Sequence, residues 1–201
     1  MFLAKGYSFY FFSLSISALI STLIFPKLKS IGIYFGITDK PNKRKQHKYP
    51  LVHLGGLGMI LTFLLVINFS YFYLGLDFDY KFFTLLIGSI SFFSIGFIDD
   101  LYSLSPFVRL FFQFVASSFL WNYGLKISLI DLSWINSSLD LIQLHYLLSF
   151  LLTNFIIIGA MNAINWLDGL DGLAAGSVLI SSFGLGIIFF LNSNFIGVIL
   201  S

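Results

Sequence analysis

Long runs of hydrophobic residues alternate with short polar segments along the whole chain. A helix needs about 20 mostly apolar residues to cross a hydrocarbon core of roughly 30 Å. Because backbone polar groups in lipid need partners within the protein, the runs predict an all-α, polytopic transmembrane helical bundle, a single integral membrane domain over residues 1–201. Six runs have suitable lengths: Tyr7–Phe25, Leu54–Leu76, Phe82–Ile98, Phe107–Tyr123, Leu141–Met161 and Leu173–Leu191. A seventh run starts at Phe195 and is cut off at Ser201.

The composition also indicates a bilayer as the solvent. Hydrophobic residues make up 58% of the chain, charged residues make up 10%, and the mean hydropathy is +0.93. Such a chain has too little polar surface to coat a water-soluble domain. It contains no cysteine, which excludes disulfides, thiolate catalysis and Cys-ligated metals. Any metal ion would need oxygen or imidazole ligands.

Positive charge is concentrated between the first two runs. Residues 27–50 hold seven of the eleven Lys and Arg residues, and an excess of these residues marks a cytoplasmic loop. Counting crossings from there places residues 99–106 and 162–172 on the same side. The three polar segments that are suited to chemistry therefore share one face, predicted to be cytoplasmic.

The first of these segments is the basic loop, in which Arg44, Lys45 and His47 are candidates for binding phosphate oxygens. Gly55 and Gly56 follow it and permit a close backbone approach. Taken alone, the loop favours the alternative of a purely topogenic segment that is attracted to anionic lipid head groups.

The second segment is the pair Asp99-Asp100, at the end of the third run. Adjacent carboxylates in apolar surroundings repel each other and are costly to desolvate. A hard cation such as Mg²⁺ would compensate them, and a carboxylate free of metal would act as a base for a phosphate nucleophile. Two solvated acids at a helix end are the alternative.

The third segment has polar residues at every third position. In a helical or 3₁₀ conformation they form one stripe, whose amides suit uracil, ribose or sugar hydroxyls and whose carboxylates suit a metal ion or its waters. A simple Asp-Gly turn is the alternative. The stripe consists of Asn162, Asn165, Asp168 and Asp171.

Taken in order, these segments resemble the polyprenyl-phosphate N-acetylhexosamine-1-phosphate transferases, a family that includes undecaprenyl-phosphate GlcNAc-1-phosphate transferase and phospho-MurNAc-pentapeptide translocase. The resemblance covers residues 38–176, and the Arg44-Lys45-x-His47 form is closer to the GlcNAc branch. It implies that an N-acetylhexosamine 1-phosphate, expected to be that of GlcNAc, passes from a UDP-amino sugar to a polyprenyl phosphate and releases UMP. This would be the first membrane step of a cell-envelope polysaccharide, such as lipopolysaccharide or cell wall polymer.

The resemblance also implies site residues and partners. Asp99 and Asp100 would be catalytic and, with Asp168, would hold Mg²⁺ or Mn²⁺. The protein would lie in the bacterial inner membrane with its active-site loops in the cytoplasm. It would bind no nucleic acid, and a homodimer is compatible with the family. Substrates would meet Arg44, Lys45, His47, Asn162, Asn165, Asp168 and Asp171.

Later segments of the family, including a Gly-Asp-x-Gly-Ser stretch and a His-rich loop, are absent from these residues, so we expect a C-terminally truncated chain. Two alternatives remain open: an enzyme completed by a longer sequence or a partner chain, and a catalytically inactive membrane remnant. A transporter or channel would place ionisable residues midway along its spans, whereas here they lie at span ends.

Overall fold

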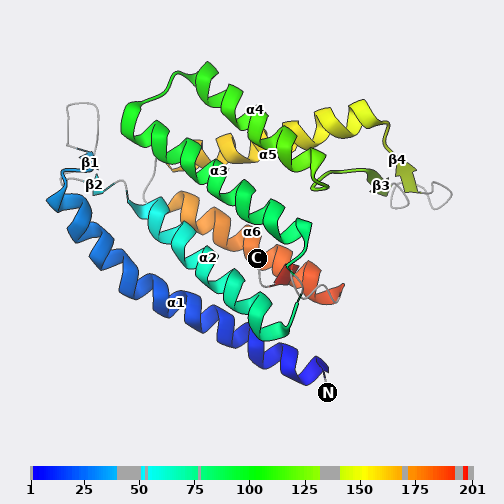
Figure 1. Cartoon of the computed structure of the whole chain (residues 1–201), viewed down its shortest axis with the longest axis horizontal. Helices are drawn as coiled ribbons and strands as arrows, with labels where there is room; N and C mark the ends of the chain where they lie inside the picture. The colour runs from blue at the N-terminus through cyan, green and yellow to red at the C-terminus, as the bar shows by residue number, and fades with distance from the viewer. Residues whose placement is uncertain are drawn as a thin grey trace. The chain divides into compact units, whose positions relative to one another are not determined.

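The computed structural model describes residues 2–39, 51–52, 54–76, 78–131, 141–168, 172–192 and 197–198. This part of the chain forms six α-helices and two small antiparallel ladders (Figure 1). The helices are α1 (Phe2–Tyr34), α2 (Gly55–Leu74), α3 (Tyr80–Tyr102), α4 (Pro106–Asn122), α5 (Tyr146–Leu167) and α6 (Leu173–Leu191). The strands are β1 (Thr38–Asp39), β2 (Leu51–Val52), β3 (Leu129–Asp131) and β4 (Leu141–Gln143). The predicted all-α bundle is confirmed.

Five of these six helices are long and apolar enough to cross a membrane: α1, α2, α3, α5 and α6. The sixth, α4, has 17 residues, and at 1.5 Å per residue it reaches about 26 Å, slightly less than a typical hydrocarbon core. Its crossing therefore stays a prediction. The predicted seventh span lies largely outside the described residues.

Several predicted helix boundaries are wrong, two of them for reasons that the structure shows. Helix α1 continues to Tyr34 with Pro26 inside it. A membrane helix tolerates the loss of the one backbone hydrogen bond that proline removes. Residues 141–143 form β4 instead of starting a helix. Hydropathy alone does not distinguish a short apolar strand from the start of a helix. Helix α5 begins at Tyr146, and the side chain of its N-cap residue His145 accepts a hydrogen bond from the Leu147 amide.

The described chain divides into two compact units. Unit 1 comprises residues 1–77, 96–103 and 176–201, and unit 2 comprises residues 78–95 and 104–175. In unit 1, α1 and α2 lie side by side (Figure 1). Gly58 permits this approach, since a Cβ at that position would lie only 3.0 Å from the Phe25 ring and 3.1 Å from Leu28. Helix α2 ends at Gly75, whose φ of 63° gives it a left-handed cap.

In unit 2, α4 packs against α5 through a row of buried polar side chains. Three levels of hydrogen bonds join the two helices or the loop between them. At one end the Trp121 indole donates to Ser149 Oγ (3.0 Å), and Ser149 donates to the Ile127 carbonyl (2.6 Å). In the middle the hydroxyls of Ser117 and Ser118 donate to Asn154 Oδ1. We call this row, which ends with a third bond described below, the α4–α5 seam.

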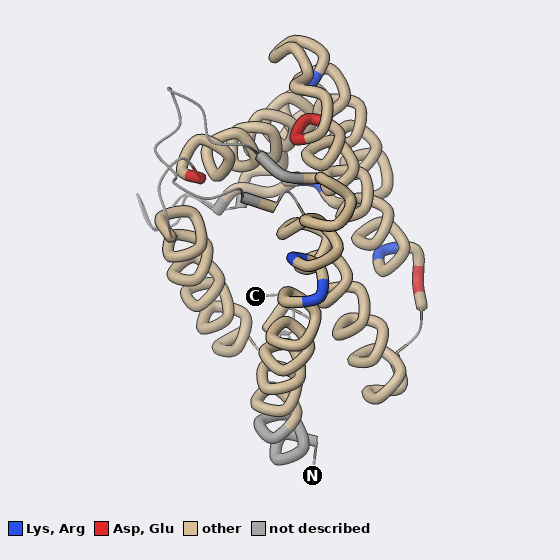
Figure 2. The backbone as a smooth tube through the Cα atoms, turned by 90° about the vertical axis from the view of Figure 1, so that its left-hand side faces the viewer, with Lys and Arg blue, Asp and Glu red and all other residues tan. Residues whose placement is uncertain are grey.

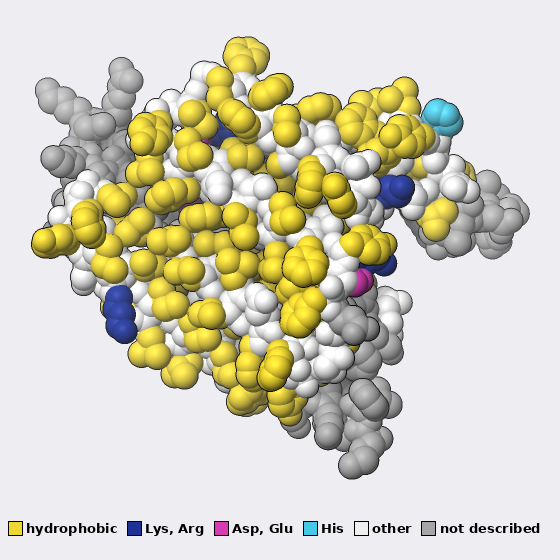
Figure 3. All heavy atoms as spheres, viewed as in Figure 1, with side chains coloured by type: hydrophobic (Ala, Val, Ile, Leu, Met, Phe, Trp, Pro, Cys, Tyr) yellow, Lys and Arg dark blue, Asp and Glu magenta, His cyan; other side chains and the backbone are white. Residues whose placement is uncertain are grey.

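The outer faces of the helices are strongly hydrophobic. Figure 3 shows apolar side chains over most of the visible face, and the most apolar 18-residue windows of the five candidate spans are only 6 to 28% buried. Lys, Arg and Asp occur at few places on the described backbone, toward helix ends or in connections (Figure 2). Lipid contact explains this distribution, because exposed apolar area on such a scale is unfavourable in water.

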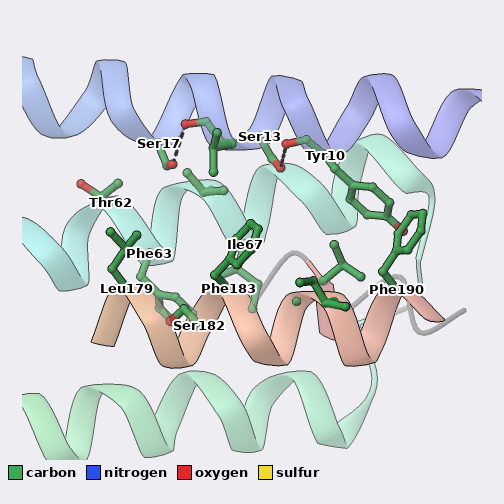
Figure 4. Close-up of a pocket in the computed structure, with 15 residues that line it drawn as sticks. Tyr10, Ser13, Ser17, Thr62, Phe63, Ile67, Leu179, Ser182, Phe183 and Phe190 are labelled. Carbon is green, nitrogen blue, oxygen red and sulfur yellow. Dashed lines mark hydrogen bonds between the residues drawn. The ribbon is translucent and has the colours of Figure 1, made fainter. Parts of the chain in front are cut away.

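Unit 1 also contains a cavity of about 510 Å³ between α1, α2 and α6. Its walls are mainly apolar and aromatic, with a few hydroxyls (Figure 4). Those of Ser13, Ser17 and Thr62 donate to carbonyls of their own helices, at 2.9, 2.8 and 2.9 Å. These three hydroxyl protons are therefore satisfied by the backbone.

Candidate functional site

The acidic pair lies in the last turn of α3, which ends at Tyr102, close to the helix end where the sequence predicts it. Asp99 is half-buried and Asp100 is exposed, since successive helical residues point about 100° apart. The helix ends on Ser103, which has a φ of 50° and whose amide donates to the Asp99 carbonyl (2.7 Å). This is the single bond of a left-handed helix cap. Ser105 then caps α4, with Pro106 at its first position.

Electrostatics at this position favours a cation. The C-terminal end of a helix carries about half a negative charge from its last carbonyls. Asp99 and Asp100 add two carboxylates to that end, which is the less favourable end for acids. A cation or a basic group at this end therefore gains from both the carboxylates and the helix dipole.

The polar stripe begins in the last two turns of α5. Asn162 and Asn165 are helical, and Asp168 is the C-cap residue, its amide donating to the Ile164 carbonyl (3.2 Å). Asn165 and Asp168 are exposed, whereas Asn162 is half-buried. For Asn162 and Asn165 the helical prediction is confirmed, and Asp168, like Asp99, lies at the negative end of a helix. Asp171 lies outside the described residues.

Asn162 has a partner that the sequence did not reveal. Its amide nitrogen donates to Gln113 Oε1 of α4 (2.7 Å) and to the Ile158 carbonyl of its own helix (2.8 Å). Gln113 is 6% exposed. This bond is the third level of the α4–α5 seam. The sequence feature that marks this partner is a glutamine within the run 107–123.

The basic loop is only partly described. Arg44, Lys45 and His47 lie outside the described residues, so their predicted contact with phosphate stays a prediction. The segments before and after residues 40–50 pair with each other in the β1–β2 ladder. In this ladder Thr38 lies opposite Val52 and Asp39 opposite Leu51. Val52 packs directly over Gly32 of α1, which ties this ladder to the end of α1.

The donor chemistry fits a hard divalent cation. Asp99 and Asp100 belong to unit 1, and Asn162, Asn165 and Asp168 belong to unit 2. Within each unit, the described residues include no group of three His or acidic side chains close enough to hold a metal ion. Mg²⁺ is commonly held by one or two carboxylates, with waters and substrate phosphates completing its octahedron. The adjacent pair Asp99-Asp100 satisfies that smaller requirement.

The fold and these polar helix ends define a multi-pass membrane protein with carboxylate and amide groups gathered at the ends of apolar helices. Comparison of sequences makes the class specific. The chain belongs to glycosyl transferase family 4, whose family model matches residues 82–201. The match includes the acidic pair and the whole polar stripe, and it confirms the family resemblance.

Curated relatives agree with this assignment. The chain is 31% identical over 161 residues to a protein of Bacillus subtilis named as a probable undecaprenyl-phosphate N-acetylglucosaminyl 1-phosphate transferase, which covers 80% of this chain and 43% of the relative. It is 28% identical to the decaprenyl-phosphate N-acetylglucosaminephosphotransferase of Mycolicibacterium smegmatis, over 79% of this chain and 39% of that protein. The undecaprenyl-phosphate alpha-N-acetylglucosaminyl 1-phosphate transferase of Escherichia coli K12 is 26% identical, over 85% and 44%. The chain thus spans less than half the length of these relatives. No solved structure matches it.

Proposed function

We propose that this protein transfers an N-acetylhexosamine 1-phosphate, that of GlcNAc, from a UDP-amino sugar to a polyprenyl phosphate. A phosphate oxygen of the lipid attacks the β-phosphorus of the UDP-sugar. The new phosphorus–oxygen bond forms as the bond to the bridging oxygen breaks, and UMP leaves. The product is a lipid-linked sugar pyrophosphate, the start of a cell-envelope polysaccharide. The observation that carries the proposal is the acidic pair at the end of a membrane-crossing helix, inside the segment that matches the family.

Position explains why such a pair suits this reaction. One substrate is a lipid and the other a charged nucleotide, so they meet only where apolar helices end. Asp99 and Asp100 lie in the last turn of α3, at that boundary. We assign Asp99, the half-buried member of the pair, to accept the proton of the lipid phosphate or to orient that phosphate. Asp100 is exposed, and at this end of the helix it would face water.

The remaining groups bind and orient the nucleotide sugar. The exposed Asn165 and Asp168 offer an amide and a carboxylate at the end of α5, suited to the uracil, ribose or sugar hydroxyls. Arg44, Lys45 and His47 would offset phosphate charge. The reaction face would be cytoplasmic and the membrane the bacterial inner membrane, in accord with the excess of Lys and Arg in residues 27–50.

The metal ion of this proposal is Mg²⁺, with Mn²⁺ as a substitute. Asp100, beside Asp99 in unit 1, would hold it, and the contribution of Asp168, which belongs to unit 2, stays a prediction. When bound, it would supply positive charge that offsets the charge developing on the phosphoryl oxygens. The donor set is all oxygen, which is the preference of both ions.

A transfer assay tests the proposal. Purified protein in nanodiscs receives undecaprenyl phosphate, Mg²⁺ and radiolabelled UDP-GlcNAc, and label in the lipid fraction is counted. We expect transfer that EDTA abolishes and added Mg²⁺ restores. Asp99→Asn should lower it by about 100-fold or more, within the 10²–10⁴ range for a lost acid–base group. Ser91→Ala, on the same helix, is the matched control, since the Ser91 hydroxyl donates to the Ile87 carbonyl of that helix.

Absence of transfer with GlcNAc and with other UDP-amino sugars, from protein shown to be helical and monodisperse, would refute the activity of this chain. The alternative, a catalytically inactive remnant, would then hold. Transfer by Asp99→Asn at the wild-type rate would instead remove Asp99 from the reaction.

A further inference from the structure

Gln113 is a buried amide on α4, and it has one specific partner on another helix. Its Oε1 accepts the Asn162 amide at 2.7 Å, although the two residues are 49 positions apart in the chain. The second proton of that amide goes to the Ile158 carbonyl at 2.8 Å. A carbonyl only accepts, so the Asn162 nitrogen must face these two oxygens. Both amide protons are therefore committed to the protein.

The rest of the α4–α5 seam fixes the register of the two helices. Gln113, Ser117 and Trp121 are spaced four apart and so lie on one face of α4. Their partners on α5 are Asn162, Asn154 and Ser149. The bilayer offers no water to replace a broken bond, so a seam bonded at three levels holds one alignment of α4 and α5. Gln113 is the level nearest the polar stripe.

We propose that Gln113 is a positioning residue, which holds Asn162 and thereby sets the direction in which Asn165 and Asp168 face. This inference rests on the proposed function, because it assigns Asn165 and Asp168 to the nucleotide-sugar site. The helix makes the coupling direct: a slip of α5 by one residue turns its side chains by about 100° and shifts them by about 1.5 Å. Such a turn would point both groups away from a bound substrate.

The first test compares the two ends of the seam in the full chain. Gln113→Leu removes the acceptor and keeps similar volume. Trp121→Phe is the matched control, because it deletes the indole bond to Ser149 at the other end of the seam. We expect Gln113→Leu to raise the KM for UDP-GlcNAc by about tenfold, the effect of losing one buried hydrogen bond. Trp121→Phe should leave the KM unchanged, and Gln113→Glu, which keeps an acceptor oxygen, should recover most of the loss.

The second test needs no activity. The chain has no cysteine, so a nitroxide on Trp166→Cys is a unique label, and Trp166 is 79% exposed beside Asn165. In this labelled background, Gln113→Leu should increase the mobility of the nitroxide measured by electron paramagnetic resonance, and Trp121→Phe should not.

Unchanged mobility in Gln113→Leu, or equal changes in Gln113→Leu and Trp121→Phe, would overturn the proposal. In an active protein, a wild-type KM for Gln113→Leu would overturn it as well. A wild-type chain that transfers no sugar counts against the proposed function alone, and the mobility comparison then decides the positioning role of Gln113.

Discussion

Replacing Asn154 with leucine is expected to loosen the middle of the α4–α5 seam. Asn154 is 3% exposed, and its Oδ1 accepts hydrogen bonds from the hydroxyls of Ser117 and Ser118 on α4. Its amide nitrogen donates to the Phe150 carbonyl of its own helix at 2.8 Å. Leucine fills a similar volume but accepts no hydrogen bond, so Asn154→Leu removes two interhelical bonds and leaves packing largely intact.

The structure sets the size of the effect. Interhelical hydrogen bonds in membrane proteins contribute about 0.6 kcal/mol on average and about 1.7 kcal/mol at most. Two lost bonds would therefore cost about 1–3 kcal/mol. Ser117 keeps a bond to the Phe114 carbonyl (3.1 Å), so its hydroxyl retains an acceptor. We accordingly expect a loss of about 1–2 kcal/mol in the free energy of unfolding.

Unfolding by SDS in mixed micelles, followed by tryptophan fluorescence, measures this loss. Asn68→Leu is the matched control, because Asn68 is exposed and its amide donates to the Leu64 carbonyl of its own helix. It should cost less than about 0.5 kcal/mol, as a surface change does. The pair Asn154→Leu and Ser117→Ala should show coupling in a double-mutant cycle. If Asn154→Leu is as stable as Asn68→Leu, the seam does not hold the helices together and the reasoning is wrong.

Two further predictions concern α3. Gly88→Ala should destabilise the protein by about 1–3 kcal/mol, because its Cβ would lie 2.5 Å from a methyl of Leu120; combined with Leu120→Ala it should cost less than the sum of the two single changes, and strict additivity would contradict the contact. For sidedness, single cysteines at Tyr80 and Tyr102 mark the two ends of the helix, both exposed. An impermeant maleimide applied to intact cells should label Tyr80→Cys but should reach Tyr102→Cys only after permeabilisation, and labelling of both from outside would refute the predicted topology.

The errors in the sequence-based boundaries have a common cause. Hydropathy identifies a run of apolar residues, but not the conformation at its ends. Helix α1 continues past Pro26 because the helical backbone loses only one bond there. Residues 141–143 are not helical because they pair with β3 in an antiparallel ladder, in which Ile130 lies opposite Ile142. In the second case the outcome depends on a partner strand beyond the run itself.

The sequence by itself determined where the membrane helices lie, that Asp99-Asp100 falls at a helix end, and that Asn162, Asn165 and Asp168 share a helical segment. These features are local, because a helix in lipid satisfies its own backbone within about 20 residues. The tertiary structure alone decided that Gln113 pairs with Asn162 and that Asn154 accepts from α4. A side-chain hydrogen bond between helices needs a particular pairing, register and rotation of both, and each of these is fixed only when the two helices pack.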